Sequence, residues 1–115
     1  MTWDDVCAVA RELPAVEGGS YHGYPALRVA GRFLVRLGDD PGDIELKGLT
    51  FDEREMLAQS APAIFHAPQG PGRPFFARLA TIDAPTLRSV LESRWRRIAP
   101  RTLLKARDAA EAPHT

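Results

Sequence analysis

The residues of this sequence best suited to chemistry are basic, and they gather toward its end. Residues 73–107 contain nine Arg or Lys side chains and two acidic ones, a net charge of +7. Guanidinium and ammonium groups bind phosphate through charge-assisted hydrogen bonds. The residues that we expect to contact phosphate here are Arg73, Arg96, Arg97, Arg101, Lys105 and Arg107. The alternative is a solvated helix end, because basic side chains there favour the helix dipole without any ligand.

A second basic set lies near residue 30. Arg28, Arg32 and Arg36 alternate with apolar residues as in a strand, so we expect all three to leave the core face of a sheet. Glu45 and Lys47 follow the same alternation and fall on that outer face. Cross-strand ion pairs account for part of this pattern. An anionic partner is the other interpretation, which makes the outer face a second candidate for phosphate contact.

Arg94 differs from the other basic residues of its segment. Helical spacing places it within the apolar arc formed by residues such as Leu87 and Leu91. An unpaired buried charge is costly, so we expect Arg94 either to pair with a carboxylate at the core edge or to extend its stem to solvent.

The charge of the whole chain limits these interpretations. Its 115 residues carry 15 basic and 15 acidic side chains, which excludes a strongly polybasic protein. Residues 1–60 hold six basic and eleven acidic side chains, whereas residues 61–115 hold nine and four. This asymmetry favours a polyanion-binding surface if the two halves are separated in space, and it has no such meaning if their charges interleave.

No catalytic or metal-binding pattern is present in the sequence. The three histidines, His22, His66 and His114, lack the spacing to other ligands that a metal site requires. Ser20 precedes His22 where a nucleophile elbow needs glycine. The one cysteine, Cys7, excludes an internal disulfide. We therefore expect no enzyme activity, no metal and no cofactor.

The elements that position these residues can be read from periodicity, caps and turns. Helical patterns follow Thr2, Thr50 and Asp83, and prolines at 14, 62 and 100 end them. Alternating patterns predict strands at 27–29, 33–37 and 44–46, then at 64–66 and 75–82, and residues 101–107 suit one more short helical turn. The sequence thus predicts one domain over residues 1–107 and a flexible tail over 108–115.

The order of these elements predicts an α+β fold. Short turns join the first three strands, so they must run antiparallel. A sheet with one apolar face needs a cover, which gives a two-layer sandwich, α-β(3)-α-β(2)-α, whose five-stranded antiparallel sheet carries helices on one face. No apolar run reaches the ~18 residues of a membrane span, and residues 1–15 lack the pattern of a signal peptide. We expect a cytoplasmic protein that does not enter a membrane.

An ordered set of short motifs resembles the MmcQ/YjbR family of small bacterial proteins. The motifs are Leu13-Pro14, residues 23–29 (GYPALRV), Gly31-Arg32-Phe33, residues 51–55 (FDERE) and residues 95–100 (WRRIAP). The resemblance covers about residues 2–105. It implies a fold like that of type III secretion chaperones, with the element order given above.

The same resemblance implies DNA binding, because the family usually carries that label. We therefore expect nucleic-acid binding through Arg and Lys contacts to phosphate, with little sequence readout. The alternative is a protein-interaction or homodimerisation module that binds no nucleic acid. Residues 67–75 (APQGPGRPF) depart from the aromatic-rich segment that is frequent in the family, which puts any binding role of that segment in doubt.

Overall fold

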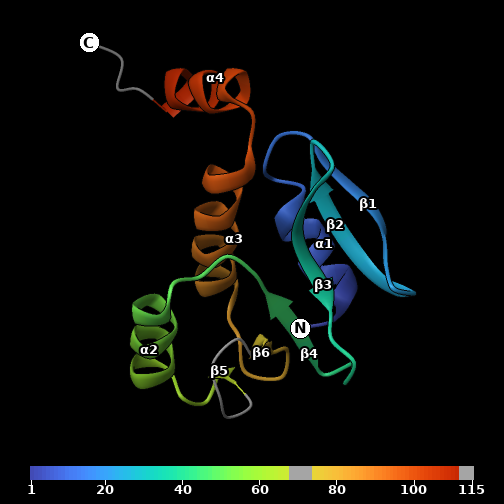
Figure 1. Ribbon diagram of the computed structural model, residues 1–115, viewed down its shortest axis with the longest axis vertical. Coiled ribbons are helices and arrows are strands. Elements are labelled where there is room, and N and C mark those ends of the chain that lie inside the picture. The colour runs from blue at the N-terminus through green and yellow to red at the C-terminus, as the bar shows by residue number, and fades with distance from the viewer. Residues whose placement is uncertain (68–73, 112–115) are drawn as a thin grey trace.

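The computed structural model describes residues 1–67 and 74–111, which form one six-stranded sheet with four helices (Figure 1). The spatial order of the strands is β1-β2-β3-β4-β6-β5, and every neighbouring pair is antiparallel. The strands are β1 (Val16–Tyr21), β2 (Tyr24–Val29), β3 (Arg32–Leu37), β4 (Asp43–Leu46), β5 (Phe65–His66) and β6 (Phe75–Arg78). The predicted α+β class is confirmed.

The helices begin where side chains can satisfy their free backbone N–H groups. Thr2 and Thr50 form capping boxes with Asp5 and Glu53 at the starts of two helices, and Asp83 caps a third. The helices are α1 (Trp3–Ala10), α2 (Phe51–Ser60), α3 (Ala84–Ile98) and α4 (Arg101–Glu111). Within the described ranges, no helix has both the length and the apolarity that a bilayer crossing requires.

The structure departs from the sequence prediction at one edge of the sheet and at the end of the chain. The glycine-rich segment before residue 24 forms β1, so the sheet has six strands rather than five. It pairs with β2 through a two-residue turn at His22 and Gly23, both at positive φ. The predicted short turn is the helix α4, which continues to Glu111, so the first four residues of the predicted flexible tail are helical.

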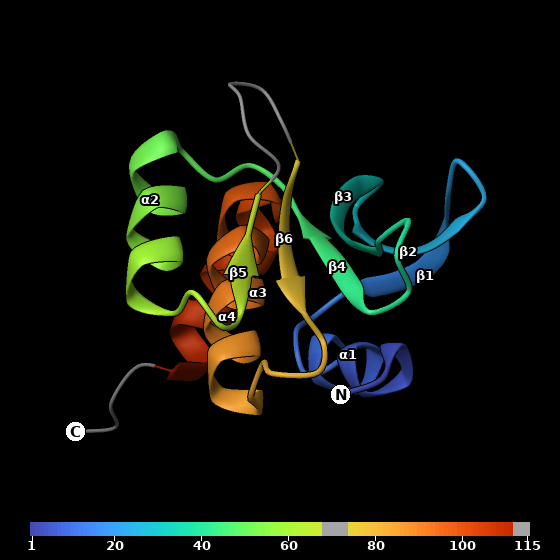
Figure 2. The same ribbon diagram turned by 90° about the horizontal axis from the view of Figure 1, so that it is seen from below.

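The core lies between one face of the sheet and the helices α1 and α3, while α2 lies beside β5 (Figure 2). Trp95 of α3 is fully buried and is the largest side chain in the core. Its indole N–H donates to the carbonyl oxygen of Pro14 at 2.9 Å, which ties α3 to the connection between α1 and β1. This contact fixes the direction of α3 across the sheet, and with it the direction of the basic side chains that α3 carries.

A β-bulge decides which side chains of β3 reach the opposite, outer face. The register pairs Leu27 with Val35 but Arg28 with Phe33, so Leu34 is an extra residue on β3. Phe33 and Arg36 consequently share the outer face although they are three positions apart. The simple alternation assumed from the sequence does not hold across this bulge, and it would have placed Phe33 in the core.

Candidate nucleic-acid interface

Of the three arginines predicted on the outer face, Arg32 is not there: the bulge pairs it with the core residue Val29 and turns it to the core side, at the exposed end of β3. Arg36 is buried, which contradicts the expectation of a solvated arginine. Its guanidinium donates to Glu45 Oε1 at 2.7 and 3.1 Å, and Asp39 and Lys47 complete the ion-pair group. Arg28 is half-buried and donates to the carbonyl oxygen of Ser20. Arg36 therefore has a structural role, and cross-strand pairing explains it.

Three predicted phosphate contacts near the end of the chain are neutralised by carboxylates. Arg107 binds Glu92 with two hydrogen bonds of 3.0 and 2.7 Å and lies over the ring of Trp95. Arg96 pairs with Asp108 at 2.9 Å and with Glu92 at 3.2 Å. The hydrogen bonds from Arg107, with the charge of Arg96, hold the pKa of the Glu92 carboxyl below its usual range. Arg97 has a carboxylate partner too, described below.

The remaining sequence candidates fall in two separate places, α4 and the start of β3. Arg101 and Lys105 are exposed on α4, at one end of the long axis of the molecule (Figure 1), and make no ion pair with the described residues. Arg32 is exposed at the start of β3 and likewise has no carboxylate partner in the described part of the chain. Arg73 lies outside the described residues.

The structure brings two arginines of α3, Arg94 and Arg97, to a single point, Gly48, and Arg32 lies close enough for its charge to act on Arg94. Arg94 donates twice to the carbonyl oxygen of Phe33, at 3.1 and 2.9 Å, and its Nη1 lies so close to Gly48 that a Cβ there would overlap it. Gly48 also has a positive φ of 74°. Arg97 donates to the Gly48 carbonyl oxygen at 2.8 Å. Glycine is therefore required at this position both by its backbone conformation and by the guanidinium packed against it.

We call Arg32, Arg94 and Arg97 the guanidinium cluster. Arg97 pairs with Glu53 of α2 at 2.7 Å, and this is the one carboxylate that the cluster engages among the described residues. Burial lowers the pKa of Arg94, and the positive charges of Arg97 and Arg32 lower it further. The cluster thus holds three cations against one anion, with one cation half-buried, and a bound anion would relieve the repulsion among them.

A group of aromatic side chains lies on the outer face, across β3 from the guanidinium cluster, because Phe33 pairs with Arg28 whereas Arg32 pairs with the core residue Val29. The rings of Tyr21 and Phe33 meet edge to face, with centroids 5.0 Å apart. Lys47 Nζ lies 5.2 and 5.3 Å from the two ring centroids. We call Tyr21, Phe33 and Lys47 the ring cluster. Phe33 links the ring cluster to the guanidinium cluster, since its carbonyl oxygen accepts from Arg94 while its half-buried ring lies on the outer face.

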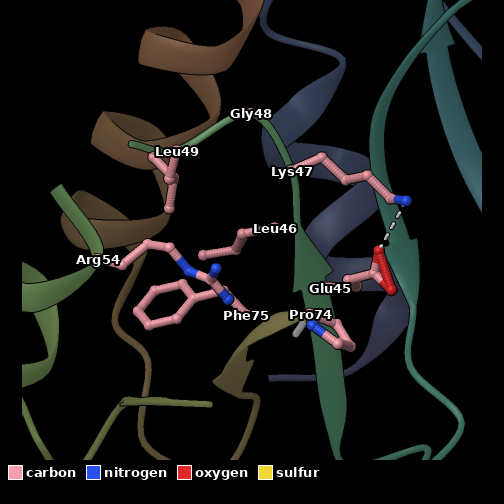
Figure 3. Close-up of a pocket in the computed structure, with 8 residues that line it drawn as sticks. All are labelled: Glu45, Leu46, Lys47, Gly48, Leu49, Arg54, Pro74 and Phe75. Carbon is pink, nitrogen blue, oxygen red and sulfur yellow. Dashed lines mark ion pairs between the residues drawn. The ribbon is translucent and has the colours of Figure 1, made fainter. Parts of the chain in front are cut away.

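A pocket of about 290 Å³ opens beside Gly48, between the end of β4 and α2 (Figure 3). Leu46, Leu49 and Phe75 form its apolar walls. The guanidinium of Arg54 lies over the Phe75 ring, 5.1 Å from its centroid, whereas Lys47 extends to the other side of β4 and pairs there with Glu45. The pocket therefore offers apolar walls and one flat cationic group.

The position of Arg94 in the sequence pointed to this site, but residue spacing alone could not identify the partner of Arg94. Arg94 was expected to pair with a carboxylate or to extend to solvent, but its partner is a backbone carbonyl. A basic residue within an apolar arc marked an unusual position, but its neighbours come from β3 and from the loop after β4. Their convergence is tertiary. No group of three His, Cys, Asp or Glu side chains suited to a metal exists in the described ranges.

Comparison with known proteins supports the fold. A scan of protein-family models and a search of curated proteins both gave no match. Among solved structures, the chain is similar to the Deinococcus radiodurans protein DR2400, described as carrying the domain DUF419, with a TM-score of 0.67 and 20% sequence identity over 95% of this chain and 86% of that one. The chain thus shares the fold of a DUF419 protein, and membership of the MmcQ/YjbR family stays a prediction from the sequence.

Proposed function

We propose that this protein binds single-stranded nucleic acid, with phosphates at the guanidinium cluster and bases at the ring cluster. The observation that carries the proposal is the charge imbalance of the guanidinium cluster, three arginines against the single carboxylate of Glu53. Phosphate oxygens match the N–H groups of guanidinium in both charge and geometry. The half-buried rings of Tyr21 and Phe33 lie across β3 from the cluster and supply apolar contact for bases, and the Phe33 carbonyl oxygen links the two sites through Arg94.

Single strands are favoured over duplexes for two reasons. A duplex encloses its bases, whereas stacking on protein aromatic side chains requires unstacked ones. Duplex binding without base readout would also need many phosphate contacts, and Arg96 and Arg107 are already neutralised by carboxylates. The site therefore suits a short stretch of strand held by a few phosphates.

A salt titration with labelled single-stranded and duplex DNA of one sequence tests the proposal. Contact with about three phosphates predicts a log–log slope of affinity against salt near −2 for the single strand. Arg32→Gln removes one contact, so we expect an affinity loss of about tenfold and a slope smaller by about 0.7. Arg101→Gln removes an equal charge from α4 and should change neither quantity.

The results that would reject the proposal are specific. No binding of either DNA at low salt, or equal losses in the two variants, would remove the guanidinium cluster as a phosphate site. The protein-interaction alternative would then remain, and its surface would be the open edge of β1. Residues 17–20 of that edge are exposed, and neither Gly19 nor its surroundings block a partner strand.

Glu53→Gln is expected to strengthen single-strand binding several-fold. Glutamine can still accept at the N3 position of the capping box, so the start of α2 is preserved. The change removes the carboxylate that competes for Arg97, whose hydrogen bond now holds the pKa of Glu53 below its usual range. Glu55→Gln on the exposed side of the same helix changes the net charge equally. Fluorescence anisotropy would contradict the argument if both variants gained the same affinity, or if Glu53→Gln lost affinity.

A further inference from the structure

The pocket beside Gly48 has an unusual floor. Arg54 reaches over the Phe75 ring (Figure 3). Phe75 in turn stacks on Phe65, with centroids 5.8 Å apart and ring planes 7° from parallel. Phe75 is 2% exposed, so its ring is covered. The half-buried guanidinium of Arg54 is therefore the accessible surface of the stack formed by Arg54, Phe75 and Phe65. A guanidinium plane is a surface on which proteins stack unpaired bases.

The walls and the volume of the pocket suit one flat ring system. Leu46 and Leu49 supply apolar contact, and about 290 Å³ lies at the lower limit of pockets that take small molecules. The one carboxylate of the lining, Glu45, is engaged by Arg36 and Lys47. The lining therefore gives no acidic group to attract a cation, and a flat, largely apolar group with polar edges fits it best.

The pocket is continuous with the guanidinium cluster. Gly48 lines the pocket, and the same residue carries Arg94 against its Cα and Arg97 on its carbonyl oxygen. A phosphate held by the cluster therefore lies next to the mouth of the pocket. The nucleotide that owns this phosphate has its base within reach of the Arg54 guanidinium.

We propose that this pocket receives one unstacked base of the bound strand, which stacks on Arg54. This inference rests on the proposed function, because the strand's phosphate at the guanidinium cluster brings the base to the pocket. The inference gives the guanidinium cluster and the pocket different roles in binding. The cluster holds the backbone, while the pocket, rather than the ring cluster, gives the tightest single base site.

The test uses two labelled octanucleotides, one fully abasic and one abasic except for a single base. The strand can bind in several registers, and the most stable one places its single base at the tightest base site. The ratio of the two affinities therefore measures how much that site adds to binding. We expect a ratio of about ten for the wild-type protein, in the range of base stacking on protein side chains. Arg54→Lys keeps the positive charge but removes the planar guanidinium on which the base stacks. The affinity ratio should therefore fall to about one, while the log–log slope of affinity against salt stays unchanged.

Two further variants make the outcome decisive. Tyr21→Leu removes stacking at the ring cluster and should keep the ratio, and Arg101→Lys is the matched control for Arg54→Lys. A ratio near one in the wild-type protein overturns the inference, as does a ratio kept in Arg54→Lys. A ratio kept in Arg54→Lys leaves the proposed function intact, because the base site then lies elsewhere. A wild-type ratio near one also removes base contact at the ring cluster and leaves only the phosphate binding of the proposed function. If no strand binds the wild-type protein at low salt, the proposed function and the inference fall together.

Discussion

Replacing Arg36 by methionine is expected to destabilise the protein by about 3 kcal/mol. The side chains of Arg36 and Glu45 are 9% and 6% exposed, so the change leaves a buried carboxylate with only Lys47 as a partner. Breaking a buried ion pair from one side typically costs 3–5 kcal/mol, and we expect the lower value because Lys47 remains 3.2 Å from Glu45 Oε2. Urea denaturation followed by circular dichroism measures this loss.

The double variant Arg36→Met, Glu45→Leu should recover most of that stability. Two apolar side chains then replace the pair, and the Tyr24 ring, now 4.9 Å from the Arg36 guanidinium, can pack on the methionine. Lys47 loses its partner but is 37% exposed and can turn to solvent. A double variant no more stable than Arg36→Met alone would show that Glu45 carries no uncompensated charge in the single variant.

Replacing Trp95 by alanine is expected to cost about 3–5 kcal/mol, a large fraction of the stability of a small domain. The side chain is fully buried, and its removal leaves a cavity between α3 and the sheet. It also removes the hydrogen bond to Pro14, which joins segments 81 residues apart. We expect the alanine variant to melt at a much lower temperature or to be unfolded without denaturant.

Trp95→Phe separates the two contributions. It keeps an aromatic ring in the core but leaves the Pro14 carbonyl oxygen without its indole donor, which costs about 1–3 kcal/mol if that oxygen finds no water. Trp3→Phe is the control, since Trp3 is half-buried. Circular dichroism should rank the Trp95 variants far below this control. A Trp95→Ala variant within 1 kcal/mol of the wild type would contradict the assigned core.

The elements with strong local signals were predictable from the sequence. Thr2, Thr50 and Asp83 begin helices because each can satisfy backbone donors within its own first turn, and the prolines that end two of these helices also act locally. Strand β1 carried no such signal. Its residues are glycine-rich and exposed on both faces, so neither alternation nor propensity marked them as a strand.

The interface depended on information that no local pattern contains. The bulge at Leu34 reverses the faces of Arg32 and Phe33, so Phe33 lies on the outer face and Arg32 on the core side. Arg36 keeps the predicted outer face and is buried there by its ion pair with Glu45. Basic charge was visible in the sequence, but which arginines meet a carboxylate depends on partners that are distant in the chain. Arg97 finds Glu53 across 44 residues, whereas Arg32 finds none among the described residues.

The sequence by itself determined the fold class, the positions of most helices and strands and the excess of arginine, since caps, turns and periodicity act over a few residues. Only the tertiary structure decided that Arg94 and Arg97 meet at Gly48, with Arg32 near Arg94, while Arg96 and Arg107 are neutralised. The physical reason is the short range of these effects. Charge pairing and close packing act over a few ångströms in space. The folded chain sets those distances through contacts between residues 44 to 61 positions apart at the guanidinium cluster, and 12 and 15 positions apart at Asp108 and Glu92.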